Sequence, residues 1–223
     1  MSNLLKSKNL LKGKNGNPLQ IAGPCSAETK EQVLNTARRL KATGKVDILR
    51  LGIWKPRTMP GSFEGVGVEG LLWMQEAKEE TGLPVTVEVA KASHVDCCLD
   101  FGVDVLWIGA RTTVSPFAME ELAIALKGVD IPVMVKNPIN PDLKLWIGGI
   151  ERLRNAGISE IAAIHRGFSY LEEKYYRNRP QWQIPIALRQ EMPDVPMICD
   201  PSHICGRRDI LEAVSQKGYD LDF

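Results

Sequence analysis

Short apolar runs rich in β-branched residues recur along the whole chain and predict seven strands. They cover Leu19–Ala22, Ile48–Ile53, Pro84–Val89, Val105–Ala110, Pro132–Lys136, Ile161–Ile164 and Pro196–Cys199. Successive positions within each run are apolar, so we expect both faces of each strand to be buried. Strands of this kind are typical of a parallel sheet that is covered by helices.

The segments between these runs have helical spacing and carry residues that begin or end helices. Thr29 and Gln32 predict a capping box at the start of the first helix, and Gly44 predicts its end. Further signals are the helix starts Ser115–Pro116 and Asn140–Pro141, the stop Gly157, and a helix over Asp209–Lys217 that ends at Gly218.

Strand and helix alternate without a linker, which predicts one α/β domain over residues 19–223 after an N-terminal leader at residues 1–18. A doubly wound sheet and a closed barrel are the two alternatives. The first strand is followed by Gly23-Pro24-Cys25-Ser26, which lacks the glycine pattern of a dinucleotide-binding turn. A (β/α)8 TIM barrel is therefore the favoured fold.

The predicted strand starts lie about 30 residues apart, so an eighth strand is due just beyond Phe223. Seven repeats do not close an eight-stranded barrel and leave open sheet edges. We therefore expect either a chain truncated before strand 8 or a departure from the standard barrel.

The composition is that of an ordinary globular protein. The 223 residues are 44% hydrophobic and 25% charged, and the formal net charge is +1. This balance provides no broad field for nucleic acid or a membrane surface, so neither is an expected partner. No apolar run is long enough to span a membrane and Met1–Pro18 lacks a signal-peptide core, which predicts a cytoplasmic protein with reduced cysteines.

Cations follow or lie in the predicted strands, at the edge where α/β barrels hold their active sites. They are Arg50, Lys55, Arg57, Arg111, Lys136 and Arg166. Any one of them alone is most simply a solvated loop cation. Six at one edge would repel one another unless anions compensate, so the pattern predicts binding of phosphates and carboxylates.

Cys25 and His203 follow the first and the seventh predicted strand. A thiolate with an imidazole suits a borderline divalent ion, but two ligands leave such a site incomplete. The alternative is a packing role for Cys25 and a loop hydrogen bond for His203. Two other features stay open: Trp54 and Trp107 either wall the pocket or pack in the core, and Phe168–Trp182 is a lid or a subunit contact.

The segments that carry these residues resemble a known enzyme family. They are Gly23-Pro24-Cys25-Ser26, Lys55-Pro56-Arg57-Thr58, Gly109-Ala110-Arg111, Val135-Lys136, His165-Arg166-Gly167 and Asp200-Pro201-Ser202-His203-Ile204-Cys205-Gly206. In this order they resemble the 3-deoxy-D-arabino-heptulosonate 7-phosphate (DAHP) synthases of the compact type I class. The resemblance implies a metal-dependent transferase that condenses phosphoenolpyruvate (PEP) with erythrose 4-phosphate, the first step of the shikimate pathway to chorismate and the aromatic amino acids.

The resemblance also implies roles for individual residues. Cys25 and His203 match two of four protein ligands of a divalent ion, which is Mn, Fe, Co or Zn. The expected PEP contacts are Arg50, Lys55, Arg111, Lys136 and Arg166; the expected aldose-phosphate contacts are Arg57 and Thr58. Lys55 and His203 are the expected catalytic residues, with Lys55 protonating the developing alkoxide.

Several departures and alternatives accompany the resemblance. Leu51, Met59 and His165 replace residues that are usual in the family, and the family's remaining Glu and Asp ligands lie on and after the eighth strand. The alternatives are a 3-deoxy-octulosonate 8-phosphate synthase acting on arabinose 5-phosphate, a Schiff-base aldolase using Lys136, and a non-catalytic phosphate-binding fragment. Family members usually form homo-dimers or tetramers, and some carry a C-terminal chorismate mutase domain.

Overall fold

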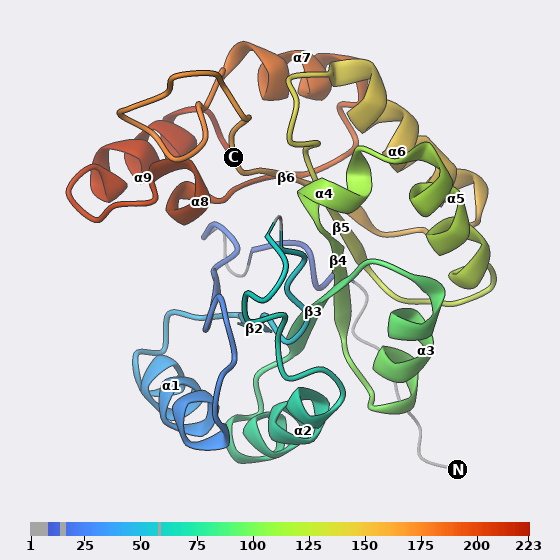
Figure 1. The fold of residues 1–223 in the computed structure, drawn as a ribbon, viewed down its shortest axis with the longest axis vertical. Coiled ribbons are helices and arrows are strands. Elements are labelled where there is room, and N and C mark those ends of the chain that lie inside the picture. The colour runs from blue at the N-terminus through green and yellow to red at the C-terminus, as the bar shows by residue number, and fades with distance from the viewer. Residues whose placement is uncertain (1–8, 14–16, 58) are drawn as a thin grey trace.

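The sheet of this protein is parallel throughout and follows chain order from β1 to β7, as its computed structural model shows (Figure 1). Residues 9–13, 17–57 and 59–223 are described by the structure. Within them the strands are β1 (Ile21–Ala22), β2 (Ile48–Leu51), β3 (Val85–Val89), β4 (Val105–Ile108), β5 (Val133–Lys136), β6 (Ile161–His165) and β7 (Met197–Cys199). The strands predicted from the apolar runs are confirmed, each within a few residues.

Helices connect the strands and surround the sheet in chain order (Figure 1). In the described part of the chain they are α1 (Lys30–Ala42), α2 (Glu69–Thr81), α3 (Ala92–Asp100), α4 (Ala110–Thr113), α5 (Pro116–Ala125), α6 (Leu143–Asn155), α7 (Gln183–Glu191), α8 (Pro201–Cys205) and α9 (Leu211–Asp220). The curled sheet with its outer helices is the predicted (β/α) barrel, with seven of its strands in the described residues and β1 and β7 at the two edges. None of these helices is both long and apolar enough to cross a membrane.

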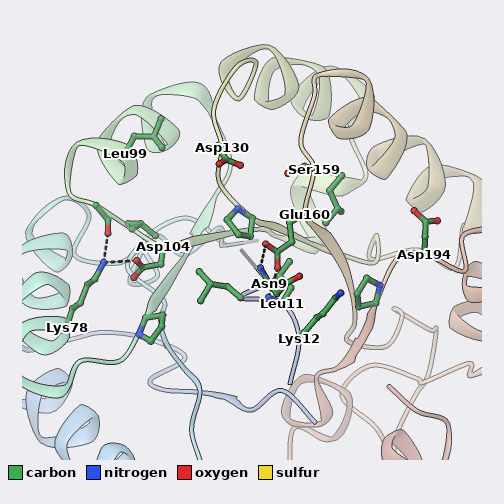
Figure 2. A pocket seen from close by; sticks show the side chains of 17 residues that line it. Asn9, Leu11, Lys12, Lys78, Leu99, Asp104, Asp130, Ser159, Glu160 and Asp194 are labelled. Atoms are coloured by element: carbon green, nitrogen blue, oxygen red, sulfur yellow. Dashed lines mark hydrogen bonds and ion pairs between the residues drawn. The ribbon is translucent and has the colours of Figure 1, made fainter. Parts of the chain in front are cut away.

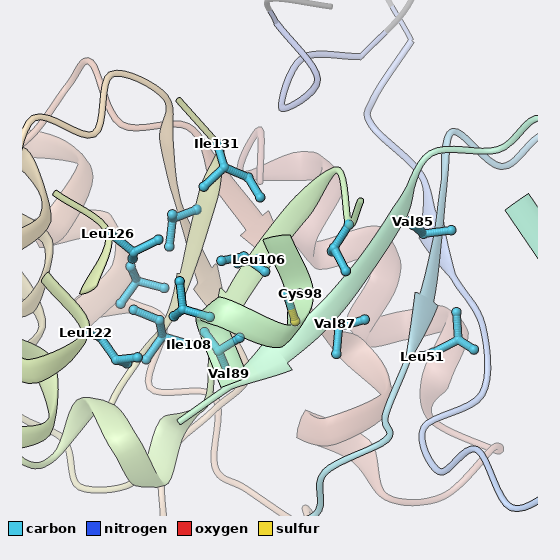
Figure 3. Packing of buried hydrophobic residues seen from close by; sticks show 14 of the residues in the cluster. Leu51, Val85, Val87, Val89, Cys98, Leu106, Ile108, Leu122, Leu126 and Ile131 are labelled. Carbon is cyan, nitrogen blue, oxygen red and sulfur yellow. The ribbon is translucent and has the colours of Figure 1, made fainter. Parts of the chain in front are cut away.

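The core has two layers because side chains alternate across each strand. The larger layer lies between the sheet and the helices, where Val87 and Ile108 pack with Leu122 and Leu126 of the α5 segment (Figure 3). The smaller layer fills the inside of the barrel. Its buried members are Leu11, Ile48, Val105, Trp107, Met134, Ala162 and Ile164.

The helix starts agree with the sequence, except in two details. Thr29 caps α1 by accepting from Gln32 N at 3.1 Å, but the Gln32 side chain accepts from Glu28 N rather than from Thr29 N, so the predicted box is shifted by one residue. Ser115 caps α5 as expected. The start predicted at Asn140–Pro141 is wrong, because Asp142 caps α6 with its carboxylate.

The last helix also differs from the prediction, since α9 continues through Gly218 to Asp220. Gly218 is buried and faces Cys199 at the end of β7. A Cβ at this position would come within 2.9 Å of Cys199 Cβ and 3.0 Å of its Sγ. This glycine therefore permits close approach of helix and strand rather than ending the helix.

Candidate active site

The carboxyl ends of β2, β4, β5 and β7 surround a cavity inside the curled sheet. It has a volume of about 330 Å³, and Arg50, Trp107, Lys136 and Asp200 lie in its wall. Arg50 and Lys136 come from the inward faces of β2 and β5. Lys136 is 7% exposed, so its ammonium group is held where solvent screens it weakly.

Asp200 is the carboxylate that joins these groups. Its Oδ2 lies 3.2 Å from Lys136 Nζ and 2.8 Å from His203 Nδ1, and its Oδ1 accepts from Ser202 Oγ at 3.0 Å. Burial acts to raise the pKa of Asp200, but Lys136 and then His203 outweigh it and hold the pKa well below the ordinary value. Asp200 also caps α8 through His203 N, so one side chain fixes both the helix and its histidine.

Cys25 and His203 meet although they are 178 residues apart. Cys25 Sγ lies 3.7 Å from His203 Nε2, and Lys55 Nζ lies 3.5 Å from the same sulfur and 2.6 Å from Cys25 O. The contact with His203, aided by Arg50 and Lys55, lowers the pKa of the Cys25 thiol to about 5 against the effect of burial. The group is therefore a thiolate at neutral pH, which is the form that attacks or binds metal.

At Lys55 a lowered pKa favours the neutral form, whereas at Cys25 it favours the charged form. Burial lowers the pKa of its ammonium group, although Cys25 and Glu88 act to raise it. A lysine in this state gives up a proton more readily than an exposed one.

Arg166 is buried and is fixed by two asparagines, Asn137 and Asn178. Its guanidinium donates to Asn178 Oδ1 at 2.8 Å, and its backbone N donates to Asn137 Oδ1 at 2.7 Å. Asn178 in turn donates to His203 O at 2.6 Å, which connects the arginine to the α8 segment. Burial lowers the pKa of Arg166 to about 10, and the nearby Arg111 contributes to the lowering.

The structure thus brings most of the proposed site residues together and leaves Arg57 apart. Arg50, Lys55 and Lys136 group with Cys25 and His203, and Arg111 lies near Arg166. Arg57 is exposed in the loop after β2, where its Nε donates to Phe63 O at 2.7 Å. Thr58 lies outside the described residues.

Four residues of this network received no role from the sequence: Glu88, Asn137, Asn178 and Asp200. Asp200 directly follows β7, so its position at a strand end was a usable signal. Asn178 lies in the long β6–α7 connection, and its contact with Arg166 depends on how that loop folds back. Trp54 stacks on His94 with 4.0 Å between ring centroids, and neither lines the 330 Å³ cavity.

The donors present fit half of a divalent metal site. Tetrahedral coordination with ordinary metal–sulfur and metal–nitrogen bonds places the two donor atoms about 3.6 Å apart, close to the 3.7 Å between Cys25 Sγ and His203 Nε2. Asp200 holds the other ring nitrogen of His203, the usual support for a metal-binding imidazole. No group of three or more His, Cys, Asp and Glu side chains suited to a metal occurs among the described residues.

Fold and site together define a (β/α)-barrel protein with a cluster of cationic side chains at the carboxyl ends of its strands. The family profile described as the DAHP synthetase I family matches residues 3–218, and the chain belongs to this family.

Relatives of two kinds match the chain. The phospho-2-dehydro-3-deoxyheptonate aldolase of Thermotoga maritima is 32% identical over 196 residues, which are 88% of this chain and 56% of that protein. A 2-dehydro-3-deoxyphosphooctonate aldolase of Caulobacter vibrioides is 32% identical over 166 residues, covering 70% of this chain and 55% of that protein. The chain therefore spans just over half the length of these curated relatives.

Solved structures agree with this assignment. The crystal structure of the Thermotoga maritima aldolase (DAHP synthase) superposes with a TM-score of 0.80 at 32% identity, over 91% of this chain and 57% of that one. A truncated form of the DAHP synthase from Thermotoga maritima gives a TM-score of 0.76 at 28% identity, over 91% of this chain and 71% of that one.

Proposed function

We propose that this chain carries the PEP-binding part of a metal-dependent DAHP synthase, which condenses PEP with erythrose 4-phosphate and water to give DAHP and phosphate. The observation that carries the proposal is that Arg50 and Lys136 line one cavity, while Lys55 and the Cys25–His203 pair lie close to these cations. PEP bears a carboxylate and a phosphate on adjacent positions, and such a cation cluster binds both.

The chemistry of the residues supports the same reaction. Arg50, Lys136 and Arg166 orient PEP and stabilise the charge of the departing phosphate. Lys55, with its lowered pKa, donates the proton that the new hydroxyl group needs. Cys25 and His203 would hold a divalent ion that polarises the aldehyde oxygen of the second substrate. Asp200 keeps the Nδ1 proton of His203 in place, so that Nε2 remains available as a donor.

A second candidate is condensation of PEP with arabinose 5-phosphate, because relatives named 2-dehydro-3-deoxyphosphooctonate aldolase also match the chain. The segment Lys55-Pro56-Arg57-Thr58 favours the four-carbon aldose phosphate, because the resemblance associates Lys-Ala-Asn-Arg-Ser with the five-carbon one.

The test supplies the purified protein with PEP, a divalent metal and either aldose phosphate, and measures product and released phosphate. We expect turnover with erythrose 4-phosphate. Preference for arabinose 5-phosphate would establish the second candidate, and PEP binding without turnover would establish a phosphate-binding chain. Trapping of substrate on Lys136 by borohydride, with no effect of a chelator, would instead establish a Schiff-base aldolase.

The proposal includes three further expectations. A cytoplasmic location follows from the sequence, since Met1–Pro18 lacks a signal-peptide core. Assembly as a homo-dimer or tetramer, and the C-terminal chorismate mutase domain that some family members carry, follow from the resemblance. Sedimentation of the purified protein tests the assembly, and conversion of chorismate to prephenate tests the mutase.

A further inference from the structure

Trp107 lies on the inward face of β4 and is the one tryptophan in the interior layer of the described barrel. Its side chain is almost fully buried. Arg50 places its guanidinium carbon 5.2 Å from the centre of the indole ring, and Lys136 places its Nζ 5.8 Å from it. These two cations lie on β2 and β5. Because β4 lies between these strands in the sheet, the Trp107 ring can contact both.

Glu88 fixes the orientation of this ring. It is the register partner of Trp107 on the neighbouring strand β3, and its Oε2 accepts the indole Nε1–H at 2.9 Å. The carboxylate occupies space that a larger residue at position 109 would fill, because a Cβ on Gly109 would lie 2.2 Å from its other oxygen. Gly109 therefore makes room for Glu88, and Glu88 holds Trp107.

Arg50 depends on the contact with the Trp107 ring more than the other cations of the site do. Its Nε is buried and has no hydrogen-bond partner in the described part of the chain. A carboxylate in contact with Arg50 would fix it but would also cancel the charge that an anion needs. An aromatic face attracts a cation without neutralising it.

We propose that Trp107 is a positioning residue for anion binding, with Glu88 as its anchor: the indole face holds Arg50 and Lys136 toward the cavity without itself neutralising either charge. This inference deepens the proposed function, since these cations form part of the PEP site. It assigns an aromatic residue to a site that otherwise consists of charged and amide side chains.

The first experiment compares two replacements of the ring in the full chain. Trp107→Phe keeps an aromatic face, whereas Trp107→Met keeps apolar volume without one. Calorimetric titration with PEP, and separately with inorganic phosphate, should show weaker binding in the order wild type, Phe, Met, with about a tenfold loss for Met. Trp73→Met on α2 is the matched control, because Trp73 packs outside the barrel and should leave the affinity unchanged.

The second experiment separates positioning from simple electrostatics at Glu88. Removing a negative charge beside a cation cluster should by itself tighten anion binding. Glu88→Gln removes the charge but keeps an oxygen for the indole N–H, so we expect equal or tighter PEP binding. Glu88→Leu removes the charge and the acceptor, which frees the ring, so we expect several-fold weaker binding in a variant that still melts cooperatively.

Several results would overturn the inference. They are equal PEP affinity of wild type and Trp107→Met, equal losses in the Phe and Met variants, tighter binding by Glu88→Leu, or no binding of either anion by the wild type. The proposed function fails differently, when wild type binds PEP but forms no product with either aldose phosphate. In that case the ordered affinities of the Trp107 variants still support the positioning role.

Discussion

The two ends of the barrel interior differ in how their charges are used. At the amino ends of the strands a cavity of about 770 Å³ is bordered by Asn9, Leu11, Lys78, Asp104 and Glu160 (Figure 2). At the carboxyl ends the cavity is smaller, about 330 Å³, and Arg50 and Lys136 lie in its wall. The larger cavity is thus at the end that holds none of the proposed site residues.

Carboxylates at the amino end are occupied by structural partners. Glu160 accepts from Leu11 N at 2.7 Å and from Asn9 N at 3.3 Å, and Asp104 accepts from Val85 N at 2.8 Å and from Lys78 at 2.7 Å. At the carboxyl end, Asp200 serves both Lys136 and His203, and further cations lie close by. Excess positive charge, rather than cavity volume, therefore distinguishes the carboxyl end, where we propose that PEP binds.

The largest expected effect is at Cys25. Cys25→Ser replaces the thiolate with a hydroxyl that is neutral at pH 7, so we expect loss of bound divalent metal. Turnover should fall by more than about 100-fold, because replacing a residue that only supports a metal ligand already costs about 10–100-fold. Metal analysis after dialysis and phosphate release measure the two effects. The thermal midpoint should stay near that of the wild type, because Cys25 is exposed.

Cys97→Ser is the matched control for this change. Cys97 is half-buried on α3, away from the carboxyl-end cavity, so metal retention and turnover should be unaffected. Full activity of Cys25→Ser would show that Cys25 is a packing residue and that its metal role was carried over wrongly.

The next largest effects are expected in the KM values of two variants at the carboxyl end, one for each proposed substrate. Arg111→Ala removes a cation near Arg166, and we expect the KM for PEP to rise at least tenfold, since a hydrogen bond to a charged group contributes about 1.5–3 kcal/mol. Arg57 lies in the loop after β2, and Arg57→Ala should raise mainly the KM for the aldose phosphate. Steady-state kinetics with each substrate varied in turn measures both, and equal changes in both constants would contradict this division.

The sequence predicts the positions of residues on strands better than those of residues on long connections. Arg50 and Lys136 lie on strands, and His203 lies in the short segment that follows β7; strand ends meet at one edge, so their grouping follows from the pattern. Side chains that act across long loops do not follow it: Asn178 reaches Arg166 and His203 only through the folded β6–α7 connection. Leu11 lies in the predicted leader, yet it packs inside the barrel with Ile48 and Val105, a long-range contact that local periodicity does not predict.

His165 offers a pH test of the interior beneath the carboxyl end. Its ring is fully buried against Trp182 and Phe168, and burial lowers its pKa to about 3. The unfolded chain binds this proton near pH 6.5, so on acidification the unfolded state gains it first and the folded state loses stability. Between pH 7 and pH 5 this group should lower the free energy of unfolding by about 2 kcal/mol.

Urea unfolding of wild type and His165→Gln at both pH values measures that loss. The variant should lack about 2 kcal/mol of the pH dependence. His94→Gln tests the same effect at a half-buried site: burial lowers the pKa of His94 to about 4, below this pH range, so this variant should also lose part of the pH dependence. Identical pH dependence in wild type and His165→Gln would show that His165 titrates normally in the folded protein.

The smallest effect is expected at the amino end and tests whether that end serves stability alone. Glu160→Ala removes the acceptor of Leu11 N, while Leu11 itself stays buried with the interior layer. A buried donor without a partner costs about 1–3 kcal/mol, reduced here because Glu160 is half-exposed and water can reach the site, so we expect about 1 kcal/mol. Glu160→Gln, which keeps one acceptor oxygen, should cost less. Chemical unfolding gives both values, and calorimetry should give the wild-type affinity for PEP in each variant. A change in PEP affinity without a change in stability would mean that the two ends of the barrel are coupled, and the division of roles between them would then be wrong.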